Sequence, residues 1–193
     1  MLGISLVHYS TAYVFDGEKS EGYKEDDQPD PQSVYAASKY LGEQELHKNT
    51  DKFYLLRLSR LFGKQGLSVS GKKSFVKLML DLAKTKTELE VVDEELSSSN
   101  YAPDLAGQTR YILEHSLPFG IYHCSNEGFA TWYQMAEEVF KIKAIDVKLI
   151  PVPASRFPRP AKRPKFAILL NTKLPPIRSW QEALKEFLSF TNS

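Results

Sequence analysis

The chain has 193 residues, of which 42% are hydrophobic and 25% are charged, and its formal net charge is +1. This composition excludes a disordered chain, and the near-neutral charge gives no general attraction to nucleic acid or to an anionic membrane. Cys124 is the only cysteine, which excludes an intramolecular disulfide and fits a reducing cytoplasm. No apolar run approaches the roughly 18 residues that a membrane span needs, and the first residues do not resemble a secretory leader.

The first half of the chain is predicted to alternate between strands and helices. A long polar loop over residues 13–31 ends in Asp30 and Pro31, a residue pair that favours a helix start. The periodicity of apolar residues predicts, in chain order, a buried strand at 4–10, a helix at 32–48, a buried strand at 52–59, an amphipathic helix at 74–86 and a short strand at 88–93.

The second half continues the alternation and adds a basic, proline-rich loop at 153–164. Asp104 and Thr131 are the predicted capping residues of two of its helices. The predicted elements are a helix at 105–115, a strand at 119–125, a helix at 132–141, a strand at 146–152 and a helix at 179–190. Strands that alternate with helices predict an α/β fold with a mainly parallel sheet.

The glycines do not form the turn that such a sheet uses to bind a dinucleotide. That turn is rich in glycine and follows the first strand of the sheet. The ten glycines nowhere form G-x-G-x-x-G or a near variant after a strand. We therefore expect the sequence to be the C-terminal part of a longer fold. We also expect the 193-residue chain alone to expose apolar sheet surface and to be inactive.

Tyr35 and Lys39 are the strongest candidates for chemistry, together with Thr11. The tyrosine and the lysine are four residues apart on a predicted helix, so they share a face, although an isolated pair of this kind is usually an ordinary surface pair. Thr11 ends a predicted parallel strand, where α/β sheets bind their ligands. Tyrosine is a weak acid at neutral pH unless its anion is stabilised, as an ammonium group one turn away would do. The Thr11 hydroxyl can hold the substrate oxygen that Tyr35 protonates. The three residues therefore suit the addition of hydride and a proton to a carbonyl group.

Several segments resemble one family along nearly the whole chain and in the same order. They are YSTAYVFDG, QPDPQSVYAASKYLGEQ, LRLSRLFG, ELEVVDEELSSSNYAPDLA, GIYHCSNEGFATWYQMAEEVF and FPRPAKRP. Together they resemble the extended short-chain dehydrogenase/reductases and, within them, the dTDP-4-dehydrorhamnose reductases. The resemblance implies that Thr11, Tyr35 and Lys39 match the catalytic Ser/Thr, Tyr and Lys. It also places Tyr35, Lys39 and Ser10 at the cofactor, NADPH or NADH.

The resemblance implies a reductase of a nucleotide-linked 4-keto-deoxysugar, in which hydride goes to C4 and Tyr35 donates the proton. Residues 1–62 would be the C-terminal part of a Rossmann-like, NAD(P)-binding sheet. Residues 63–193 would mainly bind substrate, with 103–125 returning to the sheet. We expect a cytoplasmic protein that binds a nucleotide sugar and binds neither nucleic acid nor a membrane. A homodimer is one option for its oligomeric state.

Three positions depart from the family pattern, and the first two lie where the family contacts substrate. The family aspartate after Ser-Thr is Ala12, a family tryptophan is Arg60, and the family Ser-Pro-Thr is replaced by residues 98–100. The residues predicted to contact substrate are Thr11, Ala12, Tyr13, Arg60 and Arg163. The resemblance favours Arg163 as a ligand of the substrate diphosphate, a role that suits a guanidinium group, over an ordinary solvated loop charge.

Two other functions stay open. An epimerase or dehydratase of the same superfamily usually needs an extra acid or base beside the Ser/Thr, and Ala12 provides none. A non-catalytic regulatory subunit, similar to the β subunit of methionine adenosyltransferase, would not need Thr11, Tyr35 and Lys39.

The remaining candidate residues are predicted to be structural. The four histidines lie on separate elements without ligand spacing, so we predict no metal site. Cys124 is predicted to be a packed thiol, and Trp132 and Trp180 are predicted to be core residues.

Overall fold

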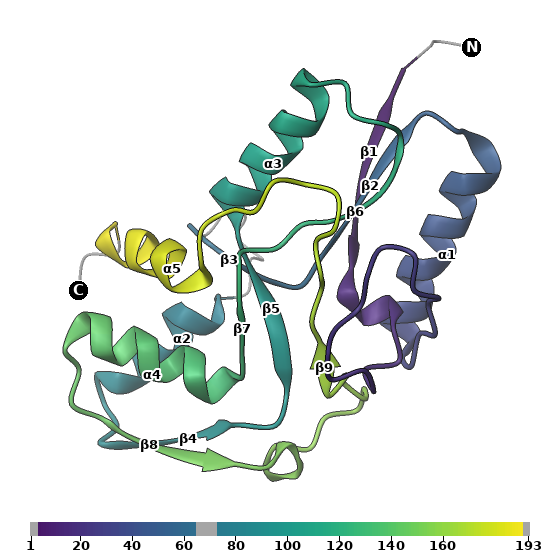
Figure 1. The fold of residues 1–193 in the computed structure, drawn as a ribbon. Coiled ribbons are helices and arrows are strands. Elements are labelled where there is room, and N and C mark those ends of the chain that lie inside the picture. Colours follow the sequence, from purple (N-terminus) through teal and green to yellow (C-terminus); the bar gives the residue numbers. More distant parts are fainter. Residues whose placement is uncertain (1–3, 65–72, 191–193) are drawn as a thin grey trace.

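A three-stranded parallel sheet carries most of the predicted site in this computed structural model, which describes residues 4–64 and 73–190. Its order is β1 (Leu6–Thr11), β2 (Phe53–Leu58) and β6 (Gly120–His123) (Figure 1). The register aligns Thr11 with Leu58, so the carboxyl ends of β1 and β2 lie at the same edge of the sheet. This pairing confirms the α/β class with parallel strands.

Two helices cover the two faces of this sheet (Figure 1). On one face, Leu46 of α1 (Val34–Asn49) packs in a cluster with Leu55 of β2. On the other face, Leu105 of α3 (Ala102–Glu114) packs in a cluster with Leu56. Because neighbouring residues of a strand point to opposite faces, Leu55 and Leu56 each anchor one helix.

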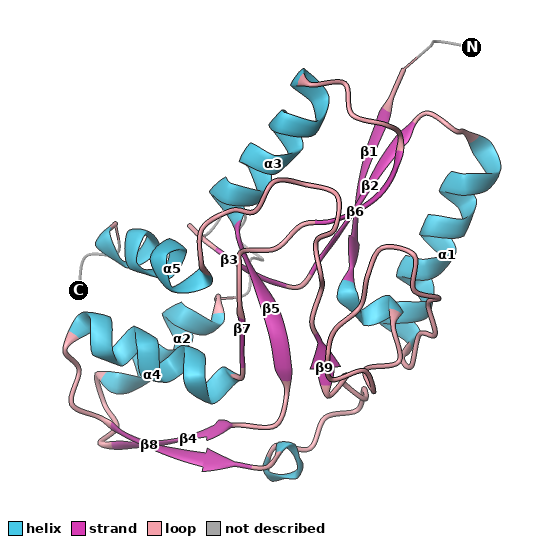
Figure 2. Ribbon diagram, in the orientation of Figure 1, coloured by secondary structure: helices cyan, strands magenta, loops and turns pink. Residues whose placement is uncertain are grey.

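A second group of strands continues from β2. The strand order is β3 (Arg60–Phe62), β5 (Leu96–Tyr101) and β7 (Phe129–Ala130), and β9 (Phe166–Ala167) also pairs with β5. Only the β5–β7 pairing is antiparallel among these pairs of described strands. A separate parallel pair, β4 (Glu88–Val92) and β8 (Lys148–Val152), lies far from β1 (Figure 2).

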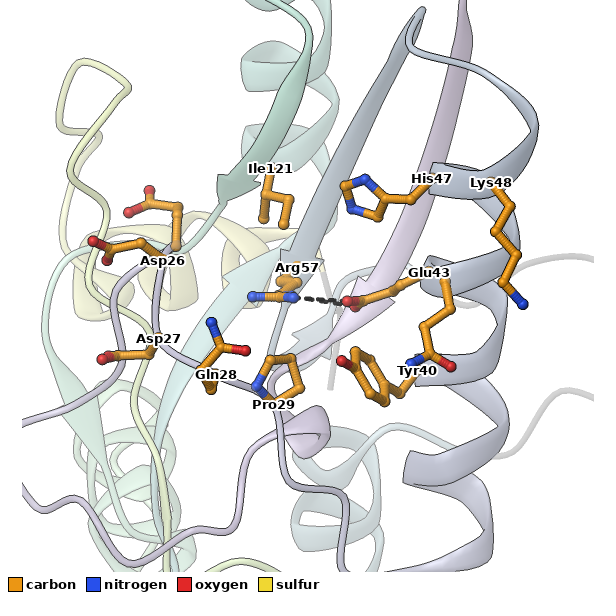
Figure 3. A pocket seen from close by; sticks show the side chains of 12 residues that line it. Asp26, Asp27, Gln28, Pro29, Tyr40, Glu43, His47, Lys48, Arg57 and Ile121 are labelled. Carbon is orange, nitrogen blue, oxygen red and sulfur yellow. Dashed lines mark hydrogen bonds and ion pairs between the residues drawn. The ribbon is translucent and has the colours of Figure 1, made fainter.

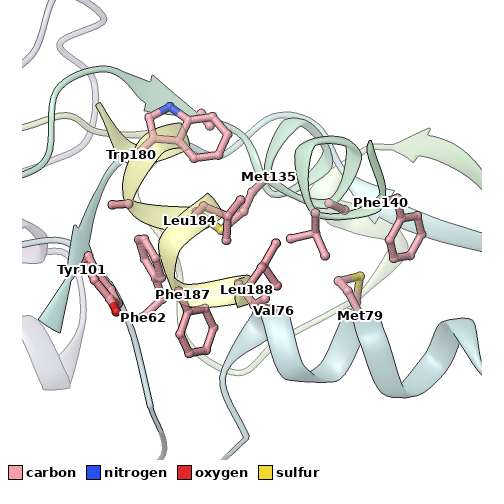
Figure 4. Close-up of a cluster of buried hydrophobic side chains, with 14 of the residues drawn as sticks. Phe62, Val76, Met79, Tyr101, Met135, Phe140, Trp180, Leu184, Phe187 and Leu188 are labelled. Carbon is pink, nitrogen blue, oxygen red and sulfur yellow. The ribbon is translucent and has the colours of Figure 1, made fainter. Parts of the chain in front are cut away.

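The largest hydrophobic cluster joins three helices to β3, β4, β5 and β7. The helices are α2 (Phe75–Ala83), α4 (Trp132–Lys143) and α5 (Trp180–Ser189). Trp180, Leu184 and Phe187 of α5 are buried in this cluster, as their spacing predicts (Figure 4). This core supports one wall of the candidate site through α4 and β3.

The helix starts agree with the sequence-based predictions in part. Thr131 caps α4 in a capping box with Gln134, as predicted. The prediction of Asp30 as the start of α1 was wrong, because Ser33 is the cap and accepts the N–H of Ala36 at 3.2 Å. Asp104 was also predicted to be a cap, but it lies inside the first turn of α3 and binds Arg178 instead.

β1 exposes apolar residues, as expected for this chain alone, although residues 4–10 by themselves were predicted to form a buried strand. Leu6 and Tyr9 are 49% and 42% exposed. Among the described residues, β2 is the only strand that pairs with β1, so β1 lies at a sheet edge. Its last residues, Ser10 and Thr11, are buried.

Among the helices of residues 4–64 and 73–190, none is long and apolar enough to cross a membrane. The same residues contain no group of three or more His, Cys, Asp or Glu side chains placed to hold a metal ion.

Candidate active site

A cavity of about 280 Å³ lies where β1, β3, α1 and α4 meet. Five of the residues predicted from the sequence line it: Thr11, Tyr13, Tyr35, Arg60 and Arg163. Aromatic residues that were not predicted, including Phe75 and Trp132, complete the wall. The fold therefore brings the candidate hydroxyl groups and two guanidinium groups to one small space.

Thr11 sits at the carboxyl end of β1 and is buried. Its Oγ1 accepts the N–H of Tyr13 at 3.2 Å and so caps a short 3₁₀ helix (Ala12–Val14). A hydroxyl group that accepts one hydrogen bond keeps its own proton for donation. Thr11 can therefore donate to an oxygen atom in the cavity.

Tyr35 and Lys39 lie on the first turns of α1, beside the end of β1. The Tyr35 side chain is 55% exposed, and its ring stands edge-on to the ring of Tyr13, with centroids 6.3 Å apart. Lys39 does not line the cavity, and its Nζ donates to the backbone oxygen of Tyr9 at 2.7 Å. The ammonium group is thus fixed at the end of the strand that carries Thr11.

Ser10 and Ala12, the neighbours of Thr11, do not line this cavity. Ser10 is 4% exposed, and its Oγ has no hydrogen-bond partner within the described part of the chain. Ala12 is buried in a cluster with Val14 and Phe15. Ser10 points to the other face of β1 because successive strand residues alternate, and Ala12 begins the 3₁₀ helix that packs on its own cluster, so only Thr11 of this trio reaches the cavity.

Arg60 forms a fixed, enclosed cation in the wall. Its Cζ lies 3.9 Å from the centroid of the Trp132 ring, and its Nη1 donates to the backbone oxygen of Ala130 at 2.7 Å. Its Nη2 donates to the backbone oxygen of Glu95. Burial lowers the pKa of Arg60 to about 10, so the group still carries its charge at neutral pH.

Tyr13 is the second phenol of the cavity. Burial raises its pKa above the ordinary value, and the charges of Arg163 and Arg60 act against that rise. The phenol is therefore neutral at neutral pH and can both donate and accept a hydrogen bond.

A second cavity of about 450 Å³, which we call the basic cleft, adjoins the first and shares Arg163 with it. Its lining includes Glu95, Phe157, Arg159, Lys162 and Lys165. The loop that was predicted to be basic therefore forms one side of a cleft beside the candidate site. The positive charges of this cleft suit an anionic group.

A third cavity, of about 480 Å³, lies between α1 and the loop at 25–29 (Figure 3). An ion pair between Glu43 and Arg57 lies at its floor. None of the sequence-predicted site residues lines this cavity. We therefore place the candidate active site at the first cavity, beside Thr11 and Tyr35.

Sequence reasoning missed several residues of this region, and two of them contact its arginines. Trp132 was predicted to be a core residue, but it lines the cavity and stacks on Arg60. Glu95 was not singled out, although its carboxylate accepts hydrogen bonds from Trp132 and Arg159. A charged residue just before a strand is common, so the sequence has no local signal for this role.

Comparison with known proteins gives one consistent family. The model of the RmlD substrate binding domain matches residues 1–192. A spore coat polysaccharide biosynthesis protein of Bacillus subtilis is 34% identical over 196 residues, which is 100% of this chain and 66% of that protein. A probable dTDP-4,6-dihydroxy-2-methyloxan-3-one 4-ketoreductase of Streptomyces antibioticus is 34% identical over 94% of this chain and 61% of that protein.

A solved structure gives the same result. The dTDP-4-dehydrorhamnose reductase of Bacillus anthracis, in complex with NADP, has a TM-score of 0.90 and 36% sequence identity. The match covers 98% of this chain and 66% of that one. The chain thus spans between 61% and 66% of the length of the relatives described here.

Proposed function

Because the chain belongs to the RmlD substrate binding domain family, we propose that its site reduces the keto group of a nucleotide-linked 4-keto-deoxysugar, with NADPH or NADH as the reductant. The matches confirm the expected relationship to the dTDP-4-dehydrorhamnose reductases and the Rossmann-like fold class. The observation that carries the proposal is the cavity shared by Thr11, Tyr35 and Arg163. In this cavity the hydroxyl groups of Thr11 and Tyr35 can bind a carbonyl oxygen, and the guanidinium group of Arg163 can bind a diphosphate.

In this proposal the Thr11 hydroxyl donates a hydrogen bond to the C4 carbonyl oxygen and polarises it. Tyr35 then gives its phenolic proton to that oxygen as C4 is reduced, so the carbonyl becomes a secondary alcohol. The ammonium group of Lys39 balances the negative charge left on the Tyr35 oxygen. When bound, the reduced nicotinamide supplies the hydride.

The described residues fit the nicotinamide end of the cofactor. The Lys39 ammonium has three N–H groups, and the bond to the Tyr9 oxygen uses one of them. The other two can donate to the hydroxyls of a ribose, next to the exposed Tyr35 side chain. The sequence has no glycine-rich turn after a strand, so its residues do not fit the diphosphate of the cofactor in the usual way. The contact predicted for Ser10 stays a prediction.

The same proposal assigns cofactor binding and substrate binding to different parts of the chain. Residues 1–62 and the returning stretch 103–125 would face the cofactor, which is supported by the pairing of β6 with β2. The remainder, from residue 63 on, would mainly bind substrate, which is supported by the basic cleft beside Arg163. A cytoplasmic location also belongs to the proposal, supported by the free, buried thiol of Cys124.

The test is the substitution Tyr35→Phe in a full-length protein that contains this sequence. Loss of the general acid should lower kcat for a dTDP-4-keto-6-deoxysugar by about 100-fold or more and leave the circular dichroism spectrum unchanged. Tyr40→Phe is the matched control, because Tyr40 lies on the same helix but lines the third cavity. Wild-type turnover of the Tyr35→Phe protein at saturating substrate would show that Tyr35 is not the acid.

A further inference from the structure

We propose that Glu95 is a positioning residue for the nucleoside diphosphate part of the substrate. This inference rests on the proposed function. The Glu95 carboxylate lies between the basic cleft and the candidate active site, where it holds Trp132 and Arg159 and keeps Arg163 close without a hydrogen bond.

The position of Glu95 is well defined by two donors. The residue lies between β4 and β5, and its side chain is 9% exposed. The Trp132 indole Nε1 donates to Oε2 at 2.9 Å, and Arg159 Nη1 donates to Oε1 at 3.0 Å. Each carboxylate oxygen thus has a partner from a different segment of the chain.

Arg163 is related to Glu95 in a different way. Its Nη1 lies 3.7 Å from Glu95 Oε2, which is within the range of an ion pair and beyond the range of a hydrogen bond. Its side chain is 36% exposed, and it lines both cavities. Arg163 is therefore attracted to this place, while no hydrogen bond within residues 4–64 and 73–190 engages its N–H groups, which can bind an anion.

The surrounding charges give Glu95 a role that a neutral residue cannot fill. Arg159 and Arg163 pair with its carboxylate, and Arg60 donates to its backbone oxygen. Without the carboxylate, the part-exposed guanidinium groups of Arg159 and Arg163 would lose their shared counter-charge, and their repulsion of each other and of the enclosed Arg60 would no longer be balanced. The arginine side chains would then sample more conformations, and a ligand would lose free energy of binding in ordering them.

Loss of the Glu95 carboxylate should weaken substrate binding and leave the rate of the chemical step nearly unchanged. Glu95 does not line the cavity of Thr11 and Tyr35, so it has no direct contact with the reacting atoms. It acts through Arg163 and Trp132, which do line that cavity. A loss of Glu95 should therefore raise KM and leave kcat nearly unchanged.

The experiment compares Glu95→Gln with Glu90→Gln in the full-length protein, using dTDP as the probe in calorimetry. Glu90 is a matched control, because it holds Arg156 of the same loop by a two-pronged pair on the outside of β4. Glu95→Gln should weaken dTDP binding by about 10-fold, the effect of one charge-assisted interaction, and raise KM for the keto-sugar by a similar factor. Glu90→Gln should leave both unchanged. Equal dTDP affinity in wild type and Glu95→Gln would overturn the inference.

A second measurement needs no variant. In wild-type protein labelled with ¹⁵N-tryptophan, the indole N–H resonance of Trp132 should shift when dTDP is added. The reason is that the Arg163 guanidinium turns from Glu95 Oε2 to the diphosphate, and Trp132 donates its hydrogen bond to that same oxygen. The indole of Trp180, which is buried in the large core, is the internal reference. An unmoved Trp132 resonance in dTDP-saturated protein would overturn the inference. Failure of the wild-type protein to bind dTDP at all would instead overturn the proposed function.

Discussion

The ion pair between Glu43 and Arg57 should be the most sensitive point of the fold outside the large core. Arg57 Nε and Nη2 donate to the Glu43 carboxylate at 3.2 and 2.7 Å, and both side chains are 2% exposed. Arg57 Nη1 has no hydrogen-bond partner in the described part of the chain. The substitution Glu43→Ala would leave a buried guanidinium with no counter-charge, so we expect the free energy of unfolding to fall by about 3–5 kcal/mol. Alanine favours helix, so the loss cannot come from α1 itself.

The assay is urea unfolding followed by circular dichroism, with two reference variants. Glu114→Ala breaks the exposed pair with Arg110 and should change stability by only a few tenths of a kcal/mol, roughly the value for surface pairs. The double variant Glu43→Leu/Arg57→Met should recover most of the stability, because the buried charge is gone as well. A Glu43→Ala protein within about 1 kcal/mol of wild type would refute the reasoning, since that loss is too small for an unpaired buried charge.

Three further predictions concern the site and the sheet. Arg163→Ala should weaken nucleotide-sugar binding by about 1.5–3 kcal/mol with little change for the cofactor, and equal affinities in calorimetry would make Arg163 an ordinary loop charge. Arg60 lines the cavity at a position where the resembled family has a tryptophan, so a substrate panel should show relaxed preference among nucleotide-linked 4-keto sugars. Strong selectivity for dTDP-4-dehydrorhamnose would show that this departure is tolerated. Burial lowers the pKa of His123 from its ordinary value of 6.5 to about 4. Below pH 6.5 the unfolded chain therefore takes up a proton that the folded protein does not bind at this site. The free energy of unfolding should fall as the pH falls towards 4, by about 2 kcal/mol between pH 7 and pH 5. Urea unfolding at these two pH values should show this loss in wild type and not in His123→Asn, and equal losses in both proteins would exclude His123 as the cause.

The part of the site that follows strand and helix rules could be predicted from the sequence. Thr11 ends a parallel strand, and Tyr35 lies near the start of the next helix, so the α/β arrangement brings both to the same edge of the sheet. The cap of α1 was predicted three residues early, because Asp30 and Ser33 are both good caps and local sequence cannot rank them.

The rest of the site depends on contacts between segments far apart in the sequence. Trp132 reaches Arg60 because the antiparallel pairing of β5 and β7 sets the position of α4. Glu95 meets Arg159 across 64 residues of sequence. Such contacts leave no spacing signal within one element. The positions of Ser10 and Ala12 have local causes: strand alternation points Ser10 away from the cavity that Thr11 faces, and the 3₁₀ helix that begins at Ala12 turns that residue into a buried cluster.

The most direct test of the proposed function is the fate of a deuterium label. A full-length protein with this sequence would be given NADPH deuterated at the transferable position of its nicotinamide, together with a dTDP-4-keto-6-deoxysugar, and the product would be read by NMR and mass spectrometry. The proposal predicts one deuterium atom at C4 of the product sugar, a solvent-derived proton on its O4 oxygen and one oxidised cofactor per product. An intact keto-sugar and unoxidised NADPH would contradict it, as would an epimerised or dehydrated sugar formed without net oxidation of the cofactor.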